Sequence, residues 1–276
     1  MKILRTFVQG TDDWFQEHLG RATASRATAI LDFTQKGIEG SKRREYRLEK
    51  VAEILSGIAI HDNYVSAPML AGIAAEPLAR TAYELEEKVM VETVGIVIGD
   101  DERTAWSPDG LVGENGAIEA KGPLTTTHLN TLDLIAQGLA GIPEDNQPQL
   151  WFGFMVDSKL EWIDFISRDG GMTKDKSKIG EALSAGNDLR QLPLRYAQIV
   201  IRLHRSECEK EIAKMREATN KFLADVDATV ARINELCPIL AEPKGAITLD
   251  DMLDAECGIS DEEIRAVDPR WTGTAV

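Results

Sequence analysis

Apolar side chains recur at helical spacing through most of the first ninety residues. Residues 11–31 predict two short helices separated by Gly20, with a threonine or serine available to cap each start. Residues 43–57 predict a helix, and residues 67–88 predict a longer one. The helix over residues 43–57 is expected to bury a single apolar stripe, formed by Leu48, Val51, Ile54 and Leu55.

Alternation of apolar and polar residues replaces the helical period after residue 90. Short strands of a meander are predicted at residues 91–98, 103–107, 110–113 and 117–121. An apolar helix is then expected over residues 146–157, followed by a strand over 160–166. Helices, strands and helices in this order predict a mixed α/β core that ends near residue 170.

The chain changes character after residue 170. Residues 172–190 are polar and predict a surface connection, whereas residues 194–236 carry apolar positions at helical spacing among many charges. That pattern predicts one long amphipathic helix or a broken pair, packed on the core or on a neighbouring subunit. We therefore expect a core over 1–170, a connection with a helical extension over 171–240 and an acidic tail over 241–276.

Charge is distributed unevenly along this acidic chain. The net charge of the 276 residues is −15, yet residues 1–50 hold ten Lys and Arg against seven Asp and Glu. This segment includes a basic run at residues 42–50, which is either a solvated helix face or a contact to a DNA backbone. A local basic channel is compatible with overall acidity.

Composition restricts the class of protein. The hydrophobic content of 43% and the charged content of 28% are typical of a soluble globular protein. No apolar run approaches the roughly 20 residues of a membrane span, and the first residues lack the apolar core of a signal peptide. The three cysteines are widely spaced and predict neither a zinc site nor a disulfide framework. A cytoplasmic protein without membrane partners is expected.

Two acids and a lysine form the strongest chemical pattern. Asp109 follows a proline in a turn, and Glu119 and Lys121 alternate with apolar residues, so both point to one face of a short strand. A hairpin turn at residues 113–116 would return Asp109 to that face. Carboxylates are the ligands that Mg²⁺ prefers, and a lysine beside a metal can orient or deprotonate water, or stabilise an oxyanion. The spacing predicts a metal-dependent site that cleaves phosphodiesters.

Three further polar residues are candidates for the same site. Glu76 lies in a stretch of small residues on the 67–88 helix; it is either an ordinary helix glutamate or an inward carboxylate with a metal or hydrogen-bond partner. Gln147 and Gln149 precede the apolar helix. They are either polar residues at a helix start or amides that orient the lysine or a bound water.

These blocks resemble a known family. Residues 103–111 together with 119–121 look like the nuclease core of the bacteriophage lambda exonuclease, or YqaJ-type viral recombinase, family of the PD-(D/E)XK superfamily. Residues 9–14 and 19–25 resemble its opening motif, and the Glu76 helix and the glutamine pair follow in the same order. The resemblance, over residues 9–166, implies a PD-(D/E)XK restriction-endonuclease-like α/β core, a mixed central sheet flanked by helices, with a helical C-terminal extension.

The resemblance also implies roles for the site residues. Asp109 and Glu119, with the backbone carbonyl of Ala120, would bind Mg²⁺, for which Mn²⁺ would substitute. Glu76 would help to bind a second ion, and two ions would clamp the attacking and leaving oxygens. Lys121 would activate or orient the attacking water.

The opening motif implies contacts to a DNA end. Ser25 would lie in a pocket for the 5′-phosphate. The family usually places an arginine before the Leu-Gly of this motif, where it grips the terminal phosphate, and this chain has His18 instead. Arg21 or Arg26 is a candidate substitute. Further expected DNA contacts come from the basic run, at Arg43 and Arg44.

The implied activity is a Mg²⁺-dependent 5′-to-3′ double-strand DNA exonuclease. It would leave 3′ single strands for an annealing protein in phage-type recombination, and the family's trimeric ring would thread DNA through its channel. The alternatives are an endonuclease or nickase of the same fold, and a binding or inhibitory protein that keeps the fold without catalysis. The chain has no GxxxxGK[ST] loop, so ATP-driven translocation is not expected.

Overall fold

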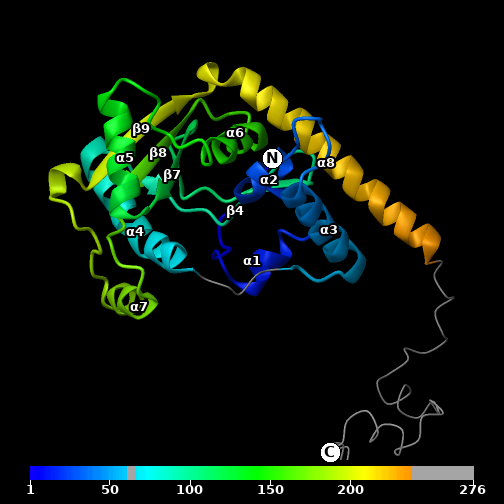
Figure 1. The fold of residues 1–276 in the computed structure, drawn as a ribbon, viewed down its shortest axis with the longest axis horizontal. Coiled ribbons are helices and arrows are strands. Elements are labelled where there is room, and N and C mark those ends of the chain that lie inside the picture. The colour runs from blue at the N-terminus through cyan, green and yellow to red at the C-terminus, as the bar shows by residue number, and fades with distance from the viewer. Residues whose placement is uncertain (61–65, 238–276) are drawn as a thin grey trace, which may run out of the picture. The chain divides into compact units, whose positions relative to one another are not determined.

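A computed structural model describes residues 1–60 and 66–237, and residues 1–230 form one compact unit (Figure 1). Two mixed sheets carry the described fold. The first has the order β1-β4-β5-β2 and the second has the order β3-β6-β7-β8-β9. The strands of the first sheet are β1 (Lys2–Leu4), β4 (Ile96–Ile98), β5 (Thr104–Trp106) and β2 (Ala22–Thr23). Those of the second are β3 (Val91–Glu92), β6 (Gly110–Val112), β7 (Gly116–Lys121), β8 (Trp162–Arg168) and β9 (Gln198–His204).

The prediction of strands between residues 91 and 121 is confirmed, but their arrangement as one meander is wrong. β4 and β5 pair with each other and join the first sheet, whereas β6 and β7 form a hairpin in the second. The N-terminal strands β1 and β2 provide the outer partners of β4 and β5. These pairings join residues between 82 and 96 positions apart in the sequence, so the local pattern does not reveal them.

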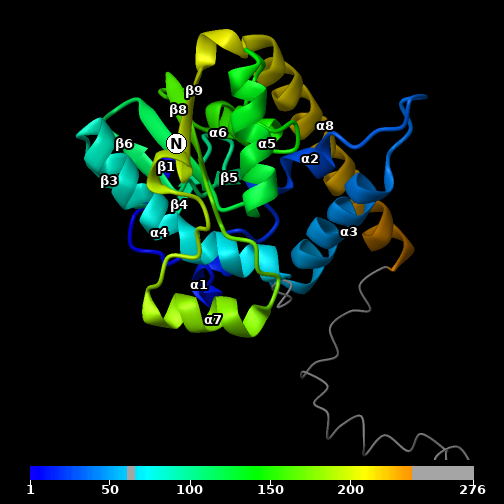
Figure 2. The same ribbon diagram turned by 60° about the vertical axis from the view of Figure 1, so that its left-hand side comes forward.

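Helices cover both faces of the second sheet (Figures 1 and 2). α4 (Ala67–Glu87) packs through Ala79 and Tyr83 against apolar residues of β7 and β8. α5 (Thr125–Ala136) and α6 (Gln147–Val156) lie against the opposite face. Side chains alternate between the two faces along β7, and Glu119 on this second face accepts a hydrogen bond from Gln149 of α6. The remaining helices are α1 (Asp12–Gln16), α2 (Ala27–Ile30), α3 (Ser41–Ser56), α7 (Lys176–Ala185) and α8 (Glu209–Leu236), with short turns η1 (Ala24–Arg26), η2 (Leu194–Tyr196) and η3 (Arg205–Glu207).

The region after residue 170 differs most from its prediction. The polar stretch 172–190 contains α7, whose fully buried Ile179 packs on Ala67 and Ala71 of α4. Residues 194–236 are not one helix or a helix pair, because they begin with η2 and β9 before α8 starts. β9 pairs with β8 along its whole length, so the central sheet continues beyond residue 170. The expected domain boundaries stay a prediction, and the acidic tail lies outside the described residues.

α3 begins and ends close to its predicted bounds but buries a different face. Only Val51 of the expected apolar stripe is buried, and its other three residues are exposed: Leu48, Ile54 and Leu55. The buried positions include Arg43, Lys50 and Glu53, each held in an ion pair. The prediction failed because these charges neutralise one another inside the fold, which a hydrophobicity pattern cannot detect.

The predicted α/β class with helices flanking mixed sheets is confirmed. Among the described helices, none is both long and apolar enough to cross a membrane.

Candidate active site

The β6–β7 hairpin brings Asp109, Glu119 and Lys121 together as the sequence predicts. Gly110 pairs with Ile118 across the hairpin, so Asp109 stands beside the end of β7. Its Oδ2 accepts a hydrogen bond of 2.6 Å from the backbone N–H of Ala120. Lys121 Nζ lies 2.6 Å from Glu119 Oε1 on the same face of β7. Two carboxylates and an ammonium therefore share one small volume.

Glu119 is the centre of this cluster. Its side chain is 2% exposed. Its Oε1 atom forms an ion pair with Lys121 Nζ and accepts a hydrogen bond of 2.7 Å from Gln149 Nε2. Its other oxygen, Oε2, is buried and has no hydrogen-bond partner. A buried carboxylate oxygen without a donor is costly unless a cation or another donor reaches it. The unpaired Oε2 atom is the first indication that the site binds a ligand.

The two glutamines at the start of α6 have different roles. Gln149 donates to Glu119 as described, whereas Gln147 Nε2 donates to the backbone carbonyl of Ile142, 3.0 Å away, and lines a separate cavity. The structure therefore brings Gln149 to the site and leaves Gln147 as a local contact at the helix start.

These glutamines form a matched pair for mutagenesis. Gln149→Ala is expected to lower the rate of the predicted phosphodiester cleavage about 10- to 100-fold, because Glu119 loses the donor that fixes its orientation. Gln147→Ala makes the same change two residues away and is expected to stay within about twofold of the wild type. Initial rates under saturating metal measure both. Equal losses in the two variants would contradict the distinction drawn between them.

Glu76 approaches the cluster from α4. Its carboxylate lies 3.5 Å from Arg80 Nη1, and the same nitrogen donates to the backbone carbonyl of Asp109. Burial raises the pKa of Glu76; Arg80 opposes this and the charge of Glu119 adds to it. Glu76 is thus electrostatically coupled to Glu119, and Arg80 ties α4 to the turn that carries Asp109.

The cluster is crowded with negative charge. Burial, and next the charge of Glu119, raise the pKa of Asp109 well above its usual range. Burial tends to lower the pKa of Lys121, but Glu119 and Asp109 outweigh burial and raise it. Lys121 is consequently an ammonium here, suited to hold and orient an anionic or polar reactant.

The donor set fits a divalent cation. Asp109 and Glu119 are hard oxygen ligands, burial and the charge of Glu119 raise the pKa of Asp109, and Glu119 Oε2 is buried without a hydrogen-bond donor. Within residues 1–60 and 66–237, no group of three or more His, Cys, Asp or Glu side chains is gathered as a metal cage. Two carboxylates with a neighbouring carbonyl and waters are a usual Mg²⁺ arrangement, since Mg²⁺ keeps several of its waters.

A cavity of about 590 Å³ joins this cluster to the segment around η1. Ser107 lies in its wall, and the buried Ser107 hydroxyl has no hydrogen-bond partner. Ser107 is not among the site residues that the sequence predicts, although its place in the same turn as Asp109 is a signal for it. The polar and charged lining residues are Gln9, His18, Thr23, Ser25, Arg26, Glu45, Glu49, Lys50, Glu53, Ser107, Asp109, Glu119, Lys121 and Gln149.

Three of the expected DNA-contact residues line this cavity. Ser25 and Arg26 come from η1; Arg26 is 41% exposed and lies 3.0 Å from Glu49. His18 is buried, and its Nδ1 lies 2.7 Å from the carbonyl oxygen of Trp14. Burial, and to a smaller degree the charge of Lys50, lower the pKa of His18. His18 is therefore neutral and does not replace the charge of an arginine.

The other expected DNA contacts point elsewhere. Arg21 donates to the backbone carbonyls of Glu17 and Glu102 and does not line the cavity. Arg43 is 2% exposed and paired with Glu39 and Asp225, so a DNA contact through its guanidinium is contradicted by its burial. Arg44 is exposed on α3 but is not part of the cavity wall.

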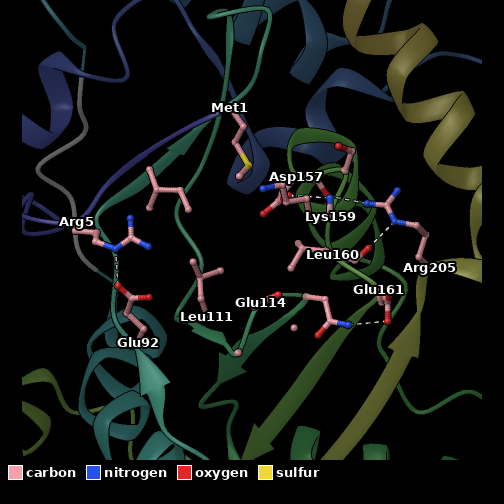
Figure 3. Close-up of a pocket in the computed structure, with 15 residues that line it drawn as sticks. Met1, Arg5, Glu92, Leu111, Glu114, Asp157, Lys159, Leu160, Glu161 and Arg205 are labelled. Atoms are coloured by element: carbon pink, nitrogen blue, oxygen red, sulfur yellow. Dashed lines mark hydrogen bonds and ion pairs between the residues drawn. The ribbon is translucent and has the colours of Figure 1, made fainter.

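A larger cavity, about 1150 Å³, lies at the opposite end of β7, around the hairpin turn (Figure 3). Several of its polar side chains already have partners: Arg5 pairs with Glu92, and Arg205 donates to the backbone carbonyls of Leu160 and Asp157. Glu161 accepts from Asn115. This cavity lacks the convergent acids and lysine, so size alone does not locate the chemistry.

Comparison with known proteins identifies the family of this chain. A family model described as the YqaJ-like viral recombinase domain matches residues 13–156, which is more than half of the chain. Those residues carry the whole acid–lysine cluster and the cavity wall around η1. None of the curated proteins gives a sequence match.

Solved structures share the fold. The alkaline exonuclease LHK-Exo from Laribacter hongkongensis is 26% identical, with a TM-score of 0.63, over 82% of this chain and 98% of its own. LHK-Exo in complex with dAMP gives 27% identity and the same TM-score and coverage. A phage-related exonuclease from Haemophilus somnus 129PT, 11% identical with a TM-score of 0.51, covers 76% of this chain and 96% of its own and is similar in fold alone.

Proposed function

Because this chain belongs to the YqaJ-like viral recombinase family, we propose that it is a phage-type exonuclease that hydrolyses double-stranded DNA from its ends. The observation that carries the proposal is the convergence of Asp109, Glu119 and Lys121 at a cavity that also holds Ser25 and Ser107. The alkaline exonuclease activity named for LHK-Exo supports the same class of reaction.

Each residue has a defined duty in this reaction. Asp109 and Glu119 would hold Mg²⁺ or Mn²⁺ with the Ala120 carbonyl, and Glu76 would help with a second ion. A bound divalent cation supplies Lewis acidity and neutralises charge that develops on phosphate oxygens. Lys121, as an ammonium, orients the attacking water and stabilises the same developing charge. Gln149 keeps Glu119 in position.

The rest of the cavity suits the end of a strand. The hydroxyls of Ser25 and Ser107 are neutral donors suited to phosphate oxygens, and Ser107 has no competing partner. LHK-Exo has been crystallised with dAMP, a 5′-mononucleotide. We propose digestion from the 5′ end, with mononucleotide release and 3′ single strands left behind for an annealing protein. A trimeric ring around the DNA would keep the enzyme on its substrate.

The proposed metal site leads to a prediction about the melting temperature of the protein. Asp109→Asn is expected to raise the melting temperature of the metal-free protein by about 2–4 °C. The substitution removes one of the crowded carboxylate charges, whose repulsion destabilises the fold by about 1 kcal/mol. Mg²⁺ at about a hundredfold excess over its dissociation constant is expected to raise the wild-type melting temperature by about 5–10 °C. The variant is expected to lose this response. Thermal denaturation with Mg²⁺, or with NaCl at equal ionic strength, is the measurement; an unchanged Mg²⁺ response in Asp109→Asn would place the metal elsewhere.

The function itself is tested with end-labelled linear duplexes. Duplex labelled at either the 5′ or the 3′ end of one strand is incubated with Mg²⁺ or with EDTA, beside a closed circular duplex. We expect early release of the 5′ label, no release in EDTA and no attack on the circle. Early release of the 3′ label would overturn the polarity, cleavage of the circle would indicate an endonuclease, and activity in EDTA would overturn the metal-dependent mechanism.

A further inference from the structure

We propose that Arg80 is a positioning residue of the active site, which raises the affinity for the divalent cation by fixing Glu76 and the Asp109 turn relative to each other. The inference rests on the proposed nuclease function and on its metal ligands. It assigns a role to a side chain that neither the sequence motifs nor the proposed reaction uses.

One nitrogen of Arg80 contacts two separate elements of the site. Its Nη1 lies 3.5 Å from Oε1 of Glu76, one turn earlier on α4, and donates a hydrogen bond of 3.2 Å to the backbone carbonyl of Asp109. Nη1 carries two donor hydrogens, so it can serve both acceptors together. The carboxylate of one proposed metal ligand and the backbone of another are therefore held by the same side chain.

The orientation of Glu76 depends on this contact. Within residues 1–60 and 66–237, Arg80 is the one ion-pair or hydrogen-bond partner of the Glu76 carboxylate. The Glu76 side chain is 33% exposed, so packing alone does not confine it. Ordering a glutamate side chain when a ligand binds costs conformational entropy. A contact that orders Glu76 before the ion arrives removes that cost from ion binding.

Asp109 is held at two points by different elements. Its Oδ2 accepts from the backbone N–H of Ala120 on β7, and its carbonyl accepts from Arg80 on α4. The first contact orients the carboxylate, and the second fixes the backbone from which the carboxylate extends. Without Arg80, the spacing between Glu76 and Asp109 would depend on the packing of α4 against the second sheet alone.

Arg80 acts through these residues and not on the substrate. The cavity wall contains Asp109, Glu119 and Lys121, whereas Arg80 does not line it. The positive charge of Arg80 by itself repels a nearby cation. Its two effects on ion binding therefore have opposite signs. A positioning role predicts weaker binding when the side chain is removed, whereas charge alone predicts tighter binding.

The test compares the full-length wild type with Arg80→Met, which keeps the aliphatic part of the side chain and removes the donors. Metal-free protein is titrated with Mn²⁺, and the free ion is measured by electron paramagnetic resonance, which needs no catalysis. We expect the dissociation constant for Mn²⁺ to rise about 10- to 100-fold, the usual range for loss of a group that orients a metal ligand. At saturating Mn²⁺, kcat for DNA hydrolysis is expected to stay within about threefold of the wild type, because the groups that line the cavity are unchanged.

Arg103→Met is the matched control. Arg103 pairs with Asp227 at 2.6 and 2.8 Å, and it does not line the cavity. Its removal is expected to leave the dissociation constant for Mn²⁺ within about twofold of the wild type. Arg80→Lys replaces Arg80→Met if melting curves of the metal-free protein show that the methionine variant is unfolded. The lysine keeps the charge on a shorter side chain and is expected to raise the dissociation constant about threefold or more.

The outcomes separate this inference from the proposed function. A wild type that binds no Mn²⁺, or that binds Mn²⁺ without hydrolysing DNA, would overturn the proposed function. An active wild type whose Arg80 variant binds Mn²⁺ as tightly or more tightly would overturn the role of Arg80 alone, as would an equal loss of affinity in Arg103→Met. A large loss of kcat with an unchanged dissociation constant would place Arg80 in the chemistry and would also contradict a positioning role.

Discussion

Lys121→Met is expected to lower kcat for DNA hydrolysis by about a thousandfold with little change in fold. The ammonium lies 2.6 Å from Glu119 in the catalytic cluster, and its pKa is raised by the carboxylates around it. Positioned groups that orient water or stabilise developing charge typically contribute 10²- to 10⁴-fold, which corresponds to about 4 kcal/mol for a thousandfold effect. Single-turnover hydrolysis of a labelled duplex isolates this step from product release.

Lys159→Met provides the control for this change. Lys159 is exposed and lines the cavity at the far end of β7, away from Asp109 and Glu119. Its loss is expected to leave kcat within about twofold of the wild type. A Lys121 variant that retains more than a tenth of the wild-type kcat would show that the acid–lysine cluster is not the centre of the chemistry.

Asp164→Ala is expected to destabilise the protein by about 3 kcal/mol, the second large effect. Asp164 is completely buried in β8, where both of its oxygens accept from Arg202 on β9 and one accepts from the Tyr83 hydroxyl at 2.7 Å. Removing the carboxylate leaves the buried Tyr83 hydroxyl without its partner and frees Arg202 to turn outward. Urea unfolding monitored by circular dichroism measures the loss.

The exposed ion pair between Arg5 and Glu92 is the comparison for this prediction. Both side chains are about half exposed, so Glu92→Ala is expected to change the free energy of unfolding by less than about 0.5 kcal/mol. Equal losses for Asp164→Ala and Glu92→Ala would show that burial and the Tyr83 contact do not set the strength of the Asp164 network. The network itself joins α4, β8 and β9, so its loss should also weaken the docking of α4.

Local patterns were sufficient for the elements that carry the chemistry. Alternation along residues 117–121 predicted the strand that places Glu119 and Lys121 on one face, and the glycine-rich turn predicted the hairpin that returns Asp109. Both features depend on neighbours in the sequence, because the strand period and the turn are set within a few residues.

Contacts between segments far apart in the sequence could not be predicted from local patterns. The apolar residues of β9 also fit a helical period, so the sequence predicts a helix there. Only the pairing with β8 shows that the segment is a strand. The burial of Arg43 depends in part on Asp225, an acid 182 positions away in the sequence that only the fold brings to it. Gln147 and Gln149 looked equivalent in the sequence, and only the direction of α6 separates them.

The sequence by itself determined the hairpin that brings Asp109, Glu119 and Lys121 together, since strand alternation and turn geometry are local properties of the chain. Only the tertiary structure decided which cations and amides face that hairpin. It brought Gln149 and not Gln147 to Glu119, and it buried His18, which lowers the pKa of that ring. The physical reason is that burial and ion pairing depend on side chains from separate elements, which meet only when α3, α6 and the second sheet pack together.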